Sequence, residues 1–188
     1  RTSQSGTSTA QSVLGGWGPP IVQTHPQAWY QSPGTGDGKA LMRPSTSKVD
    51  VSLAYEPRQK GLMWYRTFVA GFRGEYTFTN PTPIPQTIYV QFSLPSPDAG
   101  YNEFLFTLNG KPTTANVTGK SPVTEAVVVE AGGNATLIVG YKTRGLYRWT
   151  YSFGPDSCVQ NFLLHMKTDF AEVDFPTASP TGRKSSGN

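Results

Sequence analysis

The sequence has little of several features that mark particular classes of protein. Of 188 residues only Cys158 is a cysteine, so the chain can form no internal disulfide and has no cysteine-rich zinc site. No stretch approaches the roughly 20 apolar residues that a transmembrane helix needs. Charged residues make up 15% of the chain, and no basic run is longer than Arg183-Lys184. The net charge of +4 is therefore too dispersed to indicate a nucleic-acid partner.

Glycine and proline are abundant, with 20 and 16 copies, and aromatic residues make up 12% of the chain. This composition favours a turn-rich β protein over a helical one. In residues 67–79 the apolar residues recur at every second position, which is the period of a strand with one buried face. That face holds Phe68, Ala70, Phe72, Gly74, Tyr76 and Phe78. We expect these side chains to lie in the core and Arg73 and Glu75, on the other face, to lie in water.

The same alternation recurs in later segments of the chain, namely 87–95, 104–113, 124–143, 146–156 and 158–176. Asn109-Gly110 predicts a hairpin, and the turn at residues 131–134 is a second hairpin candidate. Only residues 48–63 have a helical pattern, and Pro57 opposes a long helix there. About seven or eight strands without strand–helix–strand alternation predict an all-β fold. An antiparallel β-sandwich is favoured over a closed barrel.

Composition divides the chain into four parts. Residues 1–12 and 177–188 are rich in Ser and Thr and are expected to be tails or linkers. Residues 13–48 are interrupted so often by Gly and Pro that we expect an extended segment wrapped on the domain surface. The β-sandwich domain is predicted over residues 49–176.

No residue pattern points to catalysis, a cofactor or a metal ion. His25 and His165 lack the short spacing of a metal motif, and a surface or hydrogen-bonded role is expected for His165. The acidic cluster Asp169, Glu172 and Asp174 lacks the Gly and Asn/Asp pattern of a calcium loop. A Gly-x-Ser-x-Gly motif and a phosphate-loop ending are both absent. We therefore expect a protein that is not an enzyme.

The aromatic residues allow two interpretations, since exposed rings can bind sugars or bases and buried rings build a core. Most of them lie on the apolar faces of predicted strands, where core packing explains them. Tyr89 lies on a less apolar face. The predicted interaction residues are Trp17, Trp29 and Tyr30 in the Pro/Gly-rich segment, and Trp64 and Tyr65 at the entrance to the 67–79 strand.

Three segments resemble the extracytoplasmic region of the inner-membrane protein CreD family of cell-envelope integrity proteins. They are "EPRQKGLMWYRTFVAGFRGEYTF" at residues 56–78, "GGWGPPIVQ" at 15–23 and "FLLHMKTDFAEVDFPTASPT" at 162–181. The resemblance implies a β-rich domain on the outer, periplasmic face of a bacterial inner membrane. It also implies membrane helices at both ends, which this sequence does not contain.

The leading hypothesis is a non-enzymatic extracytoplasmic domain of a membrane-anchored envelope protein, with a structural or protein–protein interaction role. Its expected partner is another envelope or membrane protein. Two alternatives stay open: a carbohydrate-binding module, in which Trp and Tyr rings form a flat platform, and a self-assembling shell or coat domain. A homo-oligomer is compatible with each of these hypotheses.

Overall fold

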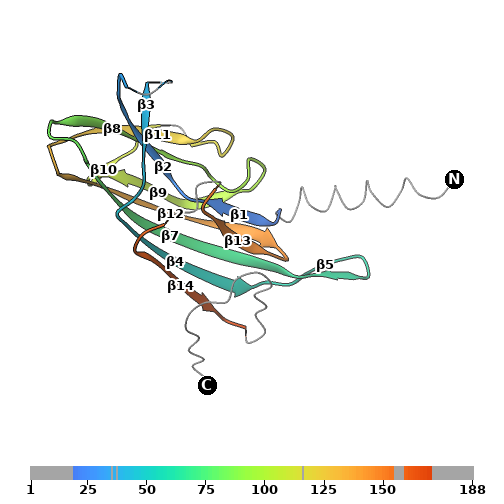
Figure 1. The fold of residues 1–188 in the computed structure, drawn as a ribbon. Helices are drawn as coiled ribbons and strands as arrows, with labels where there is room; N and C mark the ends of the chain where they lie inside the picture. Colours follow the sequence, from blue (N-terminus) through green and yellow to red (C-terminus); the bar gives the residue numbers. More distant parts are fainter. Residues whose placement is uncertain (1–18, 35, 37, 116, 155–158, 171–188) are drawn as a thin grey trace.

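The computed structural model describes residues 19–34, 36, 38–115, 117–154 and 159–170. These residues form an all-β sandwich, as the sequence predicted (Figure 1). One sheet has six strands in the order β10-β9-β12-β7-β4-β14, and the other has four in the order β11-β8-β2-β3. Trp17, Cys158, Glu172, Asp174 and both predicted tails lie outside the described residues.

The six-stranded sheet contains the longest strands. Its members are β4 (Thr46–Tyr55), β7 (Thr67–Thr79), β9 (Tyr101–Leu108), β10 (Lys111–Pro112), β12 (Asn134–Leu146) and β14 (Phe162–Thr168). β7 lies between β12 and β4, with its aromatic face buried and Arg73 and Glu75 exposed, which confirms the predicted orientation. The edge strand β14 runs parallel to β4, so this sheet is mixed rather than purely antiparallel.

The four-stranded sheet is antiparallel throughout. It contains β2 (Gln27–Gln31), β3 (Lys39–Met42), β8 (Gln86–Phe92) and β11 (Val123–Val129). Its inner face meets the six-stranded sheet, and the ring centroids of Phe92 and Phe72, one from each sheet, lie 6.1 Å apart. The apolar core lies between the two sheets.

Two further strand pairs complete the fold. β1 (Ile21–Thr24) runs parallel to β13 (Trp149–Ser152), and β5 (Arg58–Lys60) forms a hairpin with β6 (Met63–Tyr65). The hairpin projects beyond the start of β7 (Figure 1). Among the described residues there is no helix with the length and apolar character to cross a membrane.

The Asn109-Gly110 hairpin is confirmed. Leu108 pairs with Lys111, and both turn residues have positive φ, 49° for Asn109 and 76° for Gly110. Positive φ at both central positions gives a backbone twist that matches the twist of the flanking strands. Asn and Gly are the residues that adopt it at least cost.

The second predicted hairpin, at residues 131–134, is wrong. β11 pairs with β8 in one sheet and β12 pairs with β7 and β9 in the other, so the turn crosses the sandwich instead of joining neighbours. The Gly133 N–H closes the turn onto the Glu130 carbonyl at 2.9 Å. Val129 and Ala135 are both buried on the inner faces. The apolar pattern is the same for both arrangements, so periodicity could not distinguish them.

The segment expected to wrap on the surface, residues 13–48, instead contributes strands where it is described. β2 lies inside the four-stranded sheet, and Ile21 and Ala28 are fully buried. The prolines do not prevent these strands. Ile21 to Thr24 and Gln27 to Gln31 are proline-free runs of four and five residues, and strands can be that short. The helical pattern at residues 48–63 is also overridden, since these residues form strands β4 and β5 and begin β6.

Candidate functional site

The tip of the β5–β6 hairpin carries the most exposed apolar side chain of the described residues. Leu62 is 97% exposed, Met63 63% and Trp64 67%. We call these three residues the hairpin tip. Gly61 has a φ of +61°, which permits the two-residue turn between Lys60 and Met63.

The hairpin tip presents apolar groups in three directions. Gln59 pairs with Trp64 and Lys60 pairs with Met63, so Trp64 and Met63 lie on opposite faces of the hairpin. Leu62 extends from the turn between them. Because both faces are exposed, neither face is packed against the sandwich.

Basic residues surround the hairpin tip. Residues 57–66 include Arg58, Lys60 and Arg66 and contain no acidic residue. The neighbouring Glu56 contacts Arg58 at 3.6 Å and Arg144 at 3.2 Å, which neutralises its charge locally. The hairpin is therefore both apolar and cationic.

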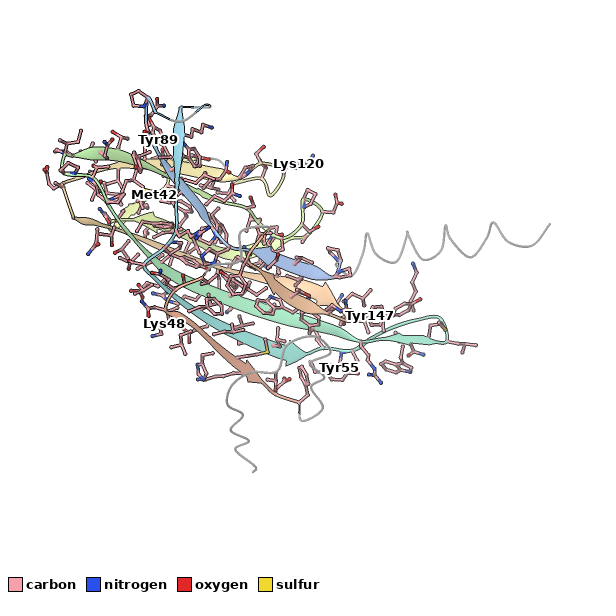
Figure 2. All side chains as sticks on the ribbon, in the orientation of Figure 1. Met42, Lys48, Tyr55, Tyr89, Lys120 and Tyr147 are labelled. Carbon is pink, nitrogen blue, oxygen red and sulfur yellow. The ribbon has the colours of Figure 1, made fainter. Side chains whose placement is uncertain are left out.

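Two exposed tyrosines flank the base of the hairpin, as Figure 2 shows for Tyr55 and Tyr147. Tyr55 is 49% exposed and Tyr147 is 63% exposed. The backbone N–H of Tyr147 donates to the Arg66 carbonyl at 3.1 Å, with Tyr147 in a left-handed conformation of φ 62°. A bulky residue in this conformation is uncommon and is often found at functional positions.

Pro19 and Phe170, the first and last residues that the structure describes and so the boundaries of its described sandwich, lie at this same end. The Leu146 N–H donates to the Pro19 carbonyl at 3.3 Å, beside the start of β7. At the other boundary, the rings of Phe170 and Tyr55 lie 6.2 Å apart. We call this region, with the hairpin and both boundaries, the hairpin end.

Trp29 lies on a different surface, the outer face of the four-stranded sheet. It pairs with Leu41 on one side and Tyr89 on the other, and Tyr89 pairs with Ala126. We call Leu41, Trp29, Tyr89 and Ala126 the Trp29 row. Leu41 is 70% exposed, whereas Trp29 and Tyr89 are half-buried. Tyr30 pairs with the buried Ile88 and so faces the other side of the sheet.

The geometry of the Trp29 row bears on sugar binding. The rings of Trp29 and Tyr89 are nearly parallel, at 8°, with centroids 5.8 Å apart. The Lys39 ammonium lies 5.0 Å from the Trp29 ring centroid. The rings therefore stack on each other and on a cation. A sugar platform needs free ring faces, so this arrangement does not favour the carbohydrate alternative.

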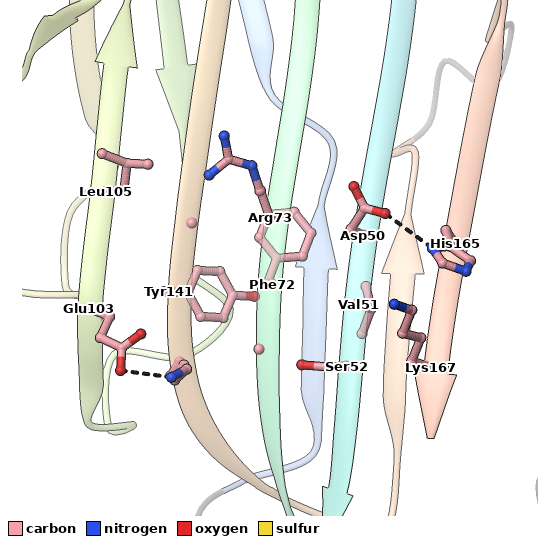
Figure 3. Close-up of a pocket in the computed structure, with 13 residues that line it drawn as sticks. Asp50, Val51, Ser52, Phe72, Arg73, Glu103, Leu105, Tyr141, His165 and Lys167 are labelled. Carbon is pink, nitrogen blue, oxygen red and sulfur yellow. Dashed lines mark hydrogen bonds and ion pairs between the residues drawn. The ribbon is translucent and has the colours of Figure 1, made fainter. Parts of the chain in front are cut away.

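A shallow hollow of about 450 Å³ lies on the outer face of the six-stranded sheet (Figure 3). Gly71 and Gly140 form its floor, because neither projects a side chain between their charged neighbours. Lys142 Nζ lies 2.7 Å from Glu103 Oε1, and His165 Nδ1 lies 3.2 Å from Asp50 Oδ1. Exposed pairs such as these contribute little to stability. His165 thus has the hydrogen-bonded surface position that the sequence predicted.

Two groups of hydrogen-bonded polar side chains join the β1–β13 pair to β7 and β12 of the six-stranded sheet. Tyr151 Oη lies 2.7 Å from His25 Nδ1 and 2.8 Å from Tyr76 Oη, and the Tyr141 hydroxyl donates to Gln23 Oε1 at 2.7 Å. Burial lowers the pKa of His25 to about 4, because the charged imidazolium would lose its hydration. Burial also raises the pKa of each of the three tyrosines. These groups are neutral near pH 7 and serve the core.

The structure thus separates the predicted interaction residues into two groups. Trp64 and Tyr65 belong to the hairpin, and Trp29 and Tyr30 belong to β2. Sequence reasoning missed Leu62, Met63 and Tyr147, because apolar residues beside a strand are normally assigned to the core. The sequence signal for these exposed residues is Gly61 between two short strand-like runs, in a stretch that has basic residues and no acidic residues. Among the described residues, no group of three or more His, Cys, Asp and Glu side chains could hold a metal ion.

No protein-family model matches the chain, and no curated protein sequence matches it. One solved structure, of a protein from Legionella pneumophila subsp. pneumophila described as a "putative nutrient binding protein", is similar in fold with a TM-score of 0.45 and 13% identity. The similarity covers 67% of this chain and 44% of the Legionella chain.

Proposed function

We propose that the chain is a non-enzymatic β-sandwich domain of a membrane-anchored cell-envelope protein, with a structural or protein–protein interaction role. The proposed location is the extracytoplasmic face of a bacterial inner membrane. This is the arrangement that the resemblance to the CreD family implies.

One observation carries the membrane-anchored part of the proposal: Pro19 and Phe170 both lie at the hairpin end. Pro19 is hydrogen-bonded next to the start of β7, and Phe170 packs beside Tyr55 at the end of β4. Neighbouring boundaries are common in domains. Here they coincide with the basic, aromatic end of the sandwich. Segments that anchor the domain from both sides would therefore hold this end toward the membrane.

The Trp29 row is the proposed protein contact. It lies on the outer face of the four-stranded sheet, away from the hairpin end (Figures 1 and 2). Leu41 projects beside Trp29, and aromatic and aliphatic side chains of this kind anchor protein interfaces. A partner protein could therefore bind while the opposite end faces the membrane.

Cell fractionation tests the proposed location. Antibodies raised against this chain should detect the native protein in the inner-membrane fraction of the source cells. Protease added to spheroplasts should degrade it, because the domain faces outward. Recovery in the cytosolic fraction, protected from the added protease, would overturn the proposal.

Photocross-linking tests the proposed protein contact. A photoreactive residue in place of Leu41 should give a discrete protein adduct in envelope membranes. The same residue in place of Leu163, which is 58% exposed on the edge strand β14, should not. Trp29→Ala should abolish the Leu41 adduct while costing about 1–3 kcal/mol of stability, because the half-buried ring loses its stacking on Tyr89 and part of its apolar burial. Equal adducts from both positions, or none, would remove the Trp29 row from consideration.

A further inference from the structure

The hairpin tip lies apart from the Trp29 row and is not covered by the sandwich. A protein contact at the Trp29 row therefore does not explain the exposed apolar side chains of the tip. We propose that the hairpin tip inserts into the interfacial region of an anionic lipid bilayer. This deepens the proposed function and rests on it in one respect: the domain must sit beside a membrane.

The shape of the hairpin tip fits a lipid bilayer better than the surface of a folded protein. Met63 and Trp64 lie on opposite faces and Leu62 extends from the turn. A protein would have to surround the hairpin with a complementary pocket in order to cover all three side chains. Lipid headgroups and acyl chains cover apolar groups from every side without a preformed surface.

The charge of the hairpin selects an anionic surface. Lys60 and Arg66 flank the hairpin tip, and residues 57–66 contain no acidic residue. The carboxylates of Glu56 and Asp169 lie at the base of the hairpin, where Glu56 is paired with Arg58 and Arg144 and Asp169 accepts from the Tyr55 N–H. Long basic side chains can bury their stems while their charged ends remain at the phosphate level. Each cation near an anionic membrane surface is worth roughly fivefold in partitioning, and this gain is lost at high salt.

The aromatic residues lie where an interfacial belt would form. Trp64 is on the hairpin, and Tyr55 and Tyr147 flank its base with their rings exposed. Trp and Tyr are enriched at membrane interfaces, since each has an apolar ring and one polar group. The sequence of groups from the tip inward is therefore aliphatic, then basic and aromatic, which matches the order from acyl chain to headgroup.

Vesicle binding by the 188-residue chain tests the proposal. The chain should float with vesicles that contain phosphatidylglycerol and much less with pure phosphatidylcholine vesicles. Leu62→Asp should weaken binding roughly tenfold or more, because burying one leucine side chain contributes at least that factor. Ile84→Asp is the matched control: Ile84 is 57% exposed in the turn at the opposite end of β7, and its substitution should leave binding unchanged.

Fluorescence shows whether the tip inserts or only adsorbs. Brominated acyl chains should quench the emission of the bound chain, and Trp64→Phe should remove most of that quenching. Flotation without quenching, abolished by salt, would mean adsorption through charge alone and would overturn insertion. Equal loss of binding in Leu62→Asp and Ile84→Asp would also overturn it.

The two proposals can fail separately. Vesicle insertion by a protein that fractionates with the cytosol would overturn the proposed function but not the lipid affinity of the hairpin. If the protein fractionates with the inner membrane but the 188-residue chain does not bind vesicles, the proposed location stands and the proposed insertion is overturned.

Discussion

The backbone N–H of Tyr55 donates a hydrogen bond of 2.8 Å to Oδ1 of Asp169, a residue 114 positions later in the chain. The Asp169 N–H in turn donates to the Leu53 carbonyl at 3.3 Å. Asp169 therefore ties the end of β14 to the end of β4, immediately before the hairpin. This pair holds one boundary of the sandwich at the hairpin end.

The first prediction is that Asp169→Ala loosens this boundary. The substitution leaves the Tyr55 N–H without its carboxylate partner, but water can replace the carboxylate at this exposed position. The expected loss is about 0.5–1.5 kcal/mol of unfolding free energy. Hydrogen exchange should accelerate in β14 and at Tyr55 first. Asp98→Ala, at an exposed turn, is the control and should change neither measurement.

The second prediction concerns Asn80, a buried side chain at the end of β7. Its Nδ2 donates to the carbonyls of Ile84, Val129 and Glu130 at 2.9–3.1 Å, and its Oδ1 accepts from Thr82. Asn80→Asp keeps the shape but turns a carboxylate oxygen toward three carbonyl oxygens. Denaturant unfolding should show a loss of roughly 3 kcal/mol or more, and more than Asn80→Ala causes at pH 7. A neutral effect of Asn80→Asp would contradict the assigned hydrogen bonds.

The third prediction is that His25 lowers the stability of the folded chain at acid pH. Its pKa is about 4 in the folded chain and about 6.5 in an unfolded chain. Between these values the unfolded state binds more protons, so stability falls as the pH drops from 6.5 toward 4 and this contribution levels off below 4. We expect a loss of about 1–2 kcal/mol, since partial exposure of the ring reduces the full effect.

Two variants isolate the contribution of His25. His25→Asn can still bond to the Tyr151 hydroxyl but cannot titrate, so the slope of stability between pH 6.5 and 4 should decrease. Gln27→Asn, an exposed substitution in β2 that changes no titratable group, should keep the wild-type slope. An unchanged slope in His25→Asn would assign the acid sensitivity to other groups.

Much of the sandwich could be predicted because period-two alternation depends only on which face is buried. In β7 the alternation of Phe72, Arg73, Tyr76 and Glu75 reproduces the observed inner and outer faces. The pairing between strands could not be predicted in the same way. The turn at residues 131–134 has the composition of a hairpin, but Val129 and Ala135 bury their side chains in different sheets. Only the tertiary packing distinguishes the two arrangements.

The candidate site could be predicted only in part. Trp64 is one of the predicted interaction residues, and the structure places it at the hairpin tip, 67% exposed. Leu62 and Met63 were not predicted, since an apolar side chain near a strand usually packs in the core. The polar network of His25 and Tyr151 was also not predicted. Its members are far apart in sequence, and their alignment depends on the parallel pairing of β1 with β13.

The fourth prediction concerns close packing at the hairpin end. Gly145 in β12 is buried, and a Cβ atom there would lie 2.6 Å from both Ile21 Cδ1 and Phe68 Cζ. Gly145→Ala should therefore cost about 1–3 kcal/mol by overpacking. Gly100→Ala is the matched control, since a Cβ at Gly100 meets no heavy atom within 4 Å, and its effect should be within about 0.5 kcal/mol.

A double mutant tests the cause of the Gly145 effect. Ile21→Val removes Cδ1 but keeps Cγ1, which would lie 2.8 Å from the new Cβ, so it should offset part of the cost of Gly145→Ala. Thermal unfolding of the two single variants and the double variant gives the coupling, which should favour the double variant by about 0.5 kcal/mol or more. Strictly additive losses would show that the Cδ1 atom of Ile21 does not set the cost at this position. The cost would then come from Phe68, whose rigid ring cannot move aside as the end of an isoleucine side chain can.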